Sequence, residues 1–215
     1  MNYVEYGKEN KYDDDIFFQK YSQMSRSQQG LAGAGEWETL RKLLPDFKDK
    51  RVLDLGCGYG WHCIYAMEHG ASSVVGVDIS HKMLEVAKEK THFPQVEYKC
   101  CAIEDVEFPE ESFDVILSSL AFHYVADYEI LVKKIYRILK SGGKLVFTVE
   151  HPVFTAYGTQ DWHYNEKGEI LHFPVDNYYY EGKRTAVFLG EKVTKYRKIF
   201  VMKANRGFII SYYHT

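Results

Sequence analysis

The sequence has little cysteine and proline, no strong excess of either charge, and no long hydrophobic run. Its 215 residues carry a formal net charge of −3 at pH 7. Nucleic-acid binding depends largely on lysine and arginine neutralising phosphates, so this balance argues against a nucleic-acid partner. No apolar run reaches the roughly 18 residues of a membrane span, and the stretch MNYVEYGKENKYDDD does not resemble a signal peptide. We therefore expect a soluble, cytoplasmic protein that acts on small molecules.

The cysteines form no recognisable metal or disulfide pattern. They are Cys57, Cys63, Cys100 and Cys101, and none of them has the Cys-x-x-Cys spacing. The nine histidines are scattered along the chain. We therefore expect no metal, and we interpret the cysteines as small buried residues of a protein from a reducing compartment.

Apolar runs alternate with helical spacings between residues 49 and 150. The pattern predicts strands near 51–55, 73–78, 95–100, 113–118 and 143–149, and helices near 60–69, 80–90 and 127–140. This alternation predicts an α/β fold, a doubly wound and mostly parallel sheet with helices on both faces. Ligands of such folds bind at the carboxyl ends of the strands.

A glycine-rich turn follows the first predicted strand. Its spacing is Gly56-x-Gly58-x-Gly60, and Trp61 stands where a dinucleotide site has its third glycine. Asp54, at the mouth of the turn, would repel a pyrophosphate but suits a ligand with an ammonium group. The backbone N–H groups of the turn can receive a carboxylate. The turn therefore disfavours a dehydrogenase and favours a ligand with an amine and a carboxylate.

Further motifs continue this pattern along the chain. Asp78 ends the second apolar run about 20 residues after the turn, the distance at which a carboxylate meets ribose hydroxyls. The segments Cys101–Asp105, Phe113–Leu120 and Leu139–Phe147 follow in order. Together these motifs resemble the class I S-adenosylmethionine-dependent methyltransferases, of the small-molecule type like methyltransferase domain 11. The resemblance covers roughly residues 51 to 150.

The resemblance implies a Rossmann-like fold, S-adenosyl-L-methionine as cofactor, and in-line methyl transfer to a small-molecule acceptor. In this family the acid at the position of Asp78 binds the ribose, and a turn like that of Ala102 and Ile103 contacts the adenine. The implied cofactor-binding residues are Tyr21, Arg26, Asp54, Gly56, Cys57, Gly58, Asp78, Ile79, Ala102, Ile103, Ser118 and Leu120. Tyr21 and Arg26 belong to residues 1–48, which we expect to form a lid over the methyltransferase domain of residues 49–215.

Two histidines are candidate catalytic residues. His123 and His151 follow the fourth and fifth predicted strands and should lie near the edge where the methyl group is presented. An imidazole there can take a proton from a hydroxyl or amine acceptor. A structural role for either histidine is the alternative.

Residues 151–190 break the alternating pattern with a run of aromatic side chains. These are Phe154, Tyr157, Trp162, Tyr164, Phe173, Tyr178, Tyr179, Tyr180 and Phe188, and Asn165 to Gly168 read as a turn between two extended runs. We expect this insertion to cap the substrate pocket. The alternatives are an antiparallel flap that packs on its own aromatic side chains, and a subunit interface, and hence a homodimer. The basic residues Lys195, Arg197 and Lys198 are interpreted as a solvated helix face.

The end of the sequence departs from the family. Residues 208–213 can supply one strand, whereas the family usually has a helix and two strands there, so we expect a shortened C-terminal end. Two alternative functions stay open: a protein that binds S-adenosylmethionine or S-adenosylhomocysteine without catalysis, and a nucleic-acid methyltransferase. The second is disfavoured because Ser118 to Tyr124 lacks the Asn/Asp-Pro-Pro-Tyr/Phe motif of enzymes that methylate base amines.

Overall fold

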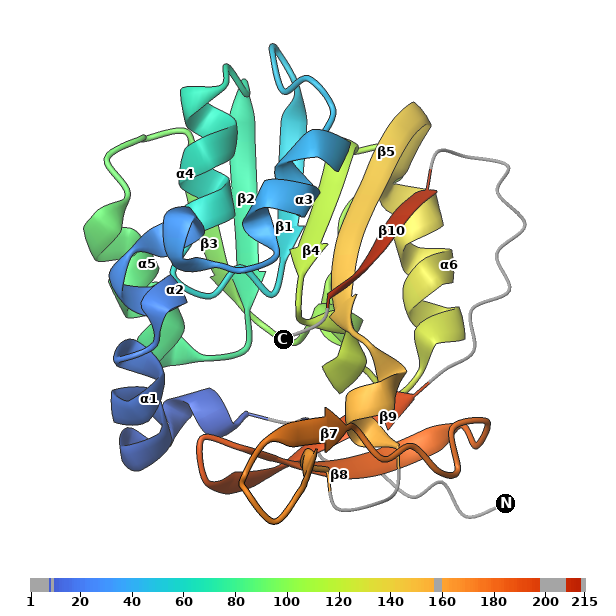
Figure 1. Cartoon of the computed structure of the whole chain (residues 1–215). Coiled ribbons are helices and arrows are strands. Elements are labelled where there is room, and N and C mark those ends of the chain that lie inside the picture. The colour runs from blue at the N-terminus through green and yellow to red at the C-terminus, as the bar shows by residue number, and fades with distance from the viewer. Residues whose placement is uncertain (1–7, 9, 157–159, 198–207, 214–215) are drawn as a thin grey trace.

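A parallel β-sheet forms the centre of the molecule (Figure 1). The computed structural model describes residue 8, residues 10–156 and 160–197, and the backbone of residues 208–213. Six strands pair in the order β10-β5-β4-β1-β2-β3, and every neighbouring pair is parallel. Their bounds are β1 (Arg51–Leu55), β2 (Ser73–Asp78), β3 (Val96–Cys100), β4 (Phe113–Ser119), β5 (Leu139–Glu150) and β10 (Phe208–Tyr213).

Strands β1 to β5 confirm the predicted alternation, and their order 3-2-1-4-5 is that of a Rossmann-like fold. Only β5 differs clearly from its predicted bounds, because it begins at Leu139. Leu139 pairs with Phe113, and the register then shifts before Lys144 pairs with Val115. Gly142, with φ +77°, lies inside this irregular stretch.

Helices cover both faces of the sheet (Figure 1). On one face, α6 (Tyr128–Ile138) packs its buried side chains against Leu53 and Leu55 of β1. On the other, α3 (Trp37–Leu43), α4 (Trp61–Glu68) and α5 (His81–Lys90) pack around Val52. Neighbouring residues of a strand point to opposite faces, so the apolar run of β1 serves both layers. The predicted two-sided core is confirmed.

The N-terminal residues form short elements outside the sheet. They are η1 (Lys11–Asp13), α1 (Asp15–Ser22), α2 (Ser25–Gln28) and η2 (Gly30–Gly33), which precede α3. The Asp13 carboxylate accepts hydrogen bonds from the Ser80 hydroxyl (2.6 Å) and the Lys82 backbone N–H (3.1 Å). Because Ser80 caps α5, these bonds fix the N-terminal segment beside the end of β2.

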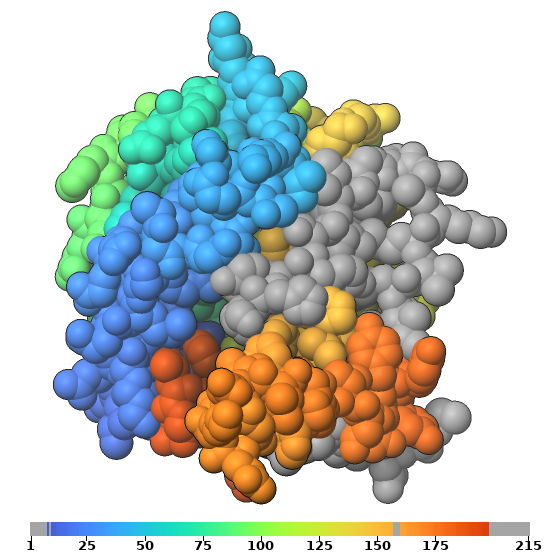
Figure 2. Space-filling view, viewed as in Figure 1, coloured from blue at the N-terminus to red at the C-terminus, as the bar shows by residue number. Residues whose placement is uncertain are grey.

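Two hairpins follow β5 and η5 (Pro152–Thr155). Strands β6 (His163–Tyr164) and β7 (Ile170–His172) flank the predicted turn at Asn165, and β8 (Gly182–Phe188) pairs with β9 (Glu191–Arg197). The β8–β9 hairpin packs on α1 through a small core of Phe17, Ala186 and Val193. In Figure 2 the blue surface of the N-terminal elements meets the orange-red surface of this part of the chain.

The prediction that Lys195, Arg197 and Lys198 lie on a solvated helix face is wrong. Lys195 and Arg197 lie on strand β9 and are only 5% and 4% exposed, while Lys198 lies outside the described residues. The burial expected for cysteine holds for Cys57 and Cys63, whereas Cys100 is exposed and Cys101 half-buried. Across the described part of the chain, no helix has the length and apolarity to cross a membrane.

Candidate functional site

A cavity of ≈ 330 Å³ lies beyond the carboxyl ends of β1, β2, β4 and β5. Its walls come from the glycine turn, the end of β2, the N-terminal elements and the β8–β9 hairpin. Of the residues predicted from the sequence, it brings together Tyr21, Arg26, Gly56, Cys57, Gly58, Asp78, Ile79, Ala102, Ile103, Leu120 and His123. Asp54, Ser118 and His151 are not among the lining residues.

The glycine turn has one side open to this cavity. Gly58 has φ +52°, and a Cβ built on it would meet no atom within 4 Å. A Cβ on Gly56 would instead lie 2.3 Å from the Cβ of Ala121. Gly56 is therefore needed for packing, whereas Gly58 leaves room for a ligand to approach the backbone.

Asp78 joins the end of β2 to the glycine turn. Its carboxylate accepts hydrogen bonds from the backbone N–H groups of Gly58 (2.8 Å) and Ser80 (2.9 Å). Burial raises the pKa of Asp78, and the two backbone donors oppose that rise. A carboxylate held in this way at a cavity wall fits the sugar-binding role that its position predicts.

Asp54 lies behind the turn. Its side chain is 1% exposed, and its Oδ2 accepts a weak hydrogen bond from the Cys63 thiol at 3.5 Å. Burial raises the pKa of Asp54 to about 7. The sequence predicts that Asp54 meets the ligand directly, but its side chain is not among the residues that line the cavity, because Asp54 sits inside β1 instead of beyond its end.

The side chains of Ser118 and His151 form hydrogen bonds with the backbone of neighbouring elements. The Ser118 hydroxyl donates to the Leu55 carbonyl (2.8 Å) and so ties β4 to β1. The Nδ1 atom of His151 accepts a hydrogen bond from the Val153 N–H (3.2 Å) at the start of η5. The structure therefore places both outside the cavity wall.

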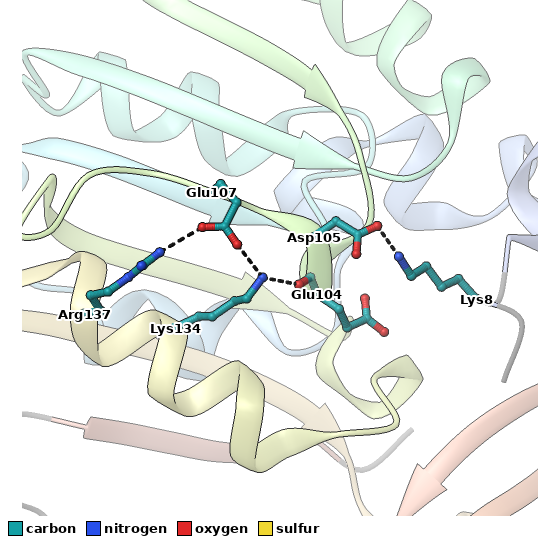
Figure 3. A network of polar contacts seen from close by, with 6 residues as sticks. All are labelled: Lys8, Glu104, Asp105, Glu107, Lys134 and Arg137. Carbon is teal, nitrogen blue, oxygen red and sulfur yellow. Dashed lines mark hydrogen bonds and ion pairs between the residues drawn. The ribbon is translucent and has the colours of Figure 1, made fainter. Parts of the chain in front are cut away.

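The turn after β3 is fixed from two sides (Figure 3). Ala102 and Ile103 line the cavity at the start of η3 (Ile103–Asp105). From α6, the Lys134 ammonium donates to the Glu104 carbonyl (2.7 Å) and pairs with Glu107 (2.8 Å). Lys8, from the N-terminal side, pairs with Asp105. These ion pairs, drawn as dashed lines in Figure 3, hold the expected adenine-contacting turn in position.

The N-terminal candidates Tyr21 and Arg26 face the same space. Arg26 forms an ion pair with the buried Glu36, and the same Glu36 oxygen accepts from the Ser119 hydroxyl (3.1 Å). Tyr21 packs edge-to-face on Tyr59, with ring centroids 5.8 Å apart. A cation from the N-terminal segment is thereby held at the cavity wall.

His123 lies on η4 (Phe122–Tyr124) and is 8% exposed. Its Nδ1 atom accepts a hydrogen bond from the Glu150 backbone N–H at 3.4 Å. Burial, followed by the nearby charges of Lys195 and Arg26, lowers the pKa of His123 well below its usual value. The imidazole is therefore neutral at pH 7.

Lys195 and Glu150 also line the cavity, and both were missed from the sequence. The Lys195 ammonium pairs with the Glu150 carboxylate and lies 5.8 Å from the Phe188 ring centroid. Val193, Lys195 and Arg197 form the buried face of β9, but residues 191–197 show no alternation of apolar and polar side chains, so the sequence carries no signal for this inward face.

The aromatic insertion contributes less to the cavity than expected. Phe188 is the one member of the predicted set, among the described residues, that lines it. Trp162, Tyr164, Tyr179 and Tyr180 are 41% to 82% exposed, and Tyr157 lies outside the described residues. The polar β8–β9 hairpin, more than the aromatic run before it, forms this wall.

Comparisons with known proteins agree with this architecture. The methyltransferase domain family matches residues 53–147. A crystal structure from Listeria monocytogenes, assigned to the S-adenosylmethionine-dependent methyltransferases, is 56% identical in sequence, covers 77% of this chain and 78% of that one, and has a TM-score of 0.72. An S-adenosylmethionine-dependent methyltransferase from Mesorhizobium loti is 40% identical, with coverages of 79% and 77% and a TM-score of 0.72.

One curated relative is an O-methyltransferase. The ubiquinone biosynthesis O-methyltransferase of Coxiella burnetii is 36% identical over 112 residues, which are 51% of this chain and 47% of that protein. The chain thus spans about half the length of this relative.

Proposed function

The chain belongs to the S-adenosylmethionine-dependent methyltransferases, and we propose that it transfers the methyl group to a small-molecule acceptor by in-line displacement. The cavity is the observation that carries the acceptor class: at ≈ 330 Å³ it falls at the lower end of the roughly 300–1,000 Å³ of small-molecule sites. It is walled by the N-terminal segment and the β8–β9 hairpin. The O-methyltransferase activity of the Coxiella burnetii relative supports the same class.

The residues of the cavity fit the cofactor by their chemistry. S-adenosylmethionine supplies a methyl group already activated by its sulfonium, so catalysis asks the protein mainly to orient the two reactants. We assign Asp78 to the ribose hydroxyls, Gly58 to close backbone approach, and Ala102 and Ile103 to the adenine. Arg26 offers a cation for the carboxylate of the methionine end.

The remaining predicted contacts complete this assignment. Gly56, Cys57, Ile79 and Leu120 line the cavity beside the residues above, and Tyr21 packs over it from the N-terminal side. We propose residues 1–48 as the lid, residues 49–215 as the methyltransferase domain, and the insertion after β5 as the substrate cap. Because Phe188 and Lys195 are the lining residues of its hairpin, the cap extends from the predicted 151–190 to Arg197.

Ligand-dependent thermal stability tests the cofactor assignment. A ligand that binds only the folded state raises the melting temperature by mass action. At a ligand concentration of 100 times Kd, the free energy of unfolding increases by about 2.7 kcal/mol. S-adenosylhomocysteine should therefore raise the melting temperature, and NADH should not. A shift with NADH alone would contradict the interpretation of the glycine turn.

A pair of glycine variants tests where the cofactor binds. Gly58 and Gly142 both have positive φ and open space where a Cβ would stand, but only Gly58 lines the cavity. Gly58→Val and Gly142→Val should each cost at least about 1–2 kcal/mol of stability, because left-handed backbone disfavours a side chain. Calorimetric titration should find S-adenosylhomocysteine binding lost only in Gly58→Val. Normal binding by that variant would remove the turn from the site.

A further inference from the structure

The β4–β5 side of the cavity carries polar groups that the cofactor assignment does not use. They are His123 on η4, Glu150 at the end of β5 and Lys195 on β9, with Phe188 beside them. The segments that bring them together are separated by tens of residues in the sequence. A methyltransferase needs a second binding region for its acceptor, and these residues form a polar cluster at the same cavity.

The hydrogen bond from the Glu150 backbone N–H determines which ring nitrogen of His123 carries the proton. A backbone N–H can only donate, so Nδ1 of His123 must present a lone pair to it. A neutral imidazole has a single N–H, which must then be on Nε2. Because burial keeps this ring neutral at pH 7, His123 has a donor, and no lone pair on Nε2, to offer a ligand. It therefore cannot act there as the general base that its sequence position suggested.

Lys195 adds a cation to the same region. Its side chain is almost fully buried, and the Glu150 carboxylate is the hydrogen-bond partner described for its ammonium. An ammonium has three N–H donors, so this bond leaves two for a ligand. The charges that act on His123 come from Lys195 and Arg26, which are both cations.

Building on the proposed function, we propose that the methyl acceptor is a small carboxylic acid, bound as its carboxylate by the Nε2–H of His123 and the ammonium of Lys195. Glu150 also lines the cavity, and its charge is balanced by the Lys195 ammonium with which it pairs. The Nε2–H of His123 and the two remaining N–H groups of Lys195 are donors, and a carboxylate accepts from both residues. Phe188 and Tyr12, which also line the cavity, favour an apolar or aromatic skeleton behind that carboxylate. His123 and Lys195 then select the acceptor by its charge and do not remove a proton.

Matched probes on the wild-type protein test the acceptor class. The protein is first titrated with S-adenosylhomocysteine; failure to bind it would contradict the proposed function and not this inference. The loaded protein is then titrated with phenylacetate, 3-phenylpropanoate and indole-3-acetate, with their primary amides, and with the amines of equal length. We expect the carboxylates to bind at least about 10-fold more tightly than amides or amines, a difference of about 1.4 kcal/mol. No carboxylate binding, or equal binding of the amides or amines, would overturn the inference.

Four variants test the two binding residues. Lys195→Met and His123→Phe should lose the preference for carboxylates while keeping their affinity for S-adenosylhomocysteine. His123→Gln, which retains an N–H donor but cannot act as a base, should keep the preference. Lys192→Met is the matched control, because Lys192 is exposed on the same strand. Loss of the preference for carboxylates in His123→Gln or Lys192→Met would contradict the assignment, and so would its retention in His123→Phe. If a variant at a buried position does not fold, the comparison of probes on the wild-type protein still decides the acceptor class.

Discussion

Asp54 and Asp114 are two acids whose surroundings act on their charge in opposite directions. Burial raises the pKa of Asp54 to about 7. Burial also disfavours the charge of Asp114, but the Arg51 backbone N–H and the Lys140 ammonium outweigh it and lower the pKa of Asp114. One residue type therefore makes opposite contributions to the pH dependence of stability.

The substitution Asp54→Asn tests this difference. Because the folded protein holds the Asp54 proton more tightly than the unfolded chain, Asp54 stabilises the fold below about pH 4, and this contribution is lost as the pH rises to about 7. The free energy of unfolding of Asp54→Asn, relative to wild type, should therefore increase between pH 4 and 7, as measured by urea denaturation.

Asp114→Asn is the matched comparison. A lowered pKa stabilises the folded state above the unfolded pKa and is lost as the pH falls, so this variant should be least stable, relative to wild type, at neutral pH. Its difference from wild type should therefore stay constant between pH 4 and 7 and shrink only below about pH 4. If the difference for Asp54→Asn were equally constant between pH 4 and 7, the burial argument for Asp54 would be wrong.

At the scale of elements, α6 supports the cavity without touching it. Its apolar face, with Leu131 and Ile135, is buried against the sheet, while Lys134 reaches the turn at Glu104 (Figure 3). The preceding residue, Lys133, pairs within the helix with Glu129 at 2.6 Å and is 72% exposed. Of these two adjacent lysines, Lys134 positions the turn after β3, whereas Lys133 forms only a surface ion pair.

Lys134→Met should weaken cofactor binding through the turn. Loss of the ammonium frees the Glu104 carbonyl, and we expect the Kd for S-adenosylhomocysteine to rise about 5-fold, equivalent to about 1 kcal/mol. Lys133→Met should leave that Kd unchanged, because exposed pairs contribute only about 0–1 kcal/mol to stability. Calorimetry on both variants checks this, and equal affinities would show that the turn needs no support from α6.

At the scale of the whole molecule, the cavity is closed by segments from opposite ends of the described chain. Phe17 of α1 is fully buried, and its ring lies edge-to-face with Phe188 of the hairpin at 5.8 Å. Lys20 donates to the Leu189 carbonyl at 3.0 Å. This small core is separate from the two large cores on the faces of the sheet.

Phe17→Ala should therefore loosen the hairpin selectively. Truncating a buried phenylalanine typically costs about 3–5 kcal/mol, and here the loss falls on the contact between α1 and the hairpin. Hydrogen exchange should speed up in β8 and β9 more than in β1 and β4, and S-adenosylhomocysteine should dissociate faster. Phe113→Ala, in the main core, is the control and should speed exchange across the sheet. If Phe17→Ala sped up hydrogen exchange equally in all these strands, α1 and the hairpin would not unfold separately from the central sheet.

The central sheet and the glycine turn could be predicted from the sequence, because both depend on local patterns. The apolar runs fix β1 to β4, and the position of Asp78 follows from where β2 ends. Family membership and the cofactor follow from the same motifs. The junction before β5 departs from the local pattern, which predicts a helix to residue 140 and a strand from residue 143, because the pairing of Leu139 with Phe113 ends the helix at Ile138 and begins the strand at Leu139.

The chemistry on the far side of the cavity depends on contacts between residues that are distant in the sequence, so it could not be predicted from local patterns. Asp54 lies at the predicted place in the chain, yet packing against α4 turns its carboxyl away from the ligand space. The His123 proton is assigned by a backbone group 27 residues away, and the buried Lys195 has its partner, Glu150, 45 residues before it in the sequence. Such contacts have no local signal in the sequence, because they depend on how β5 and the β8–β9 hairpin pack together. Periodicity indicates which face of a strand a residue occupies, but the residues that it contacts on that face depend on the tertiary fold.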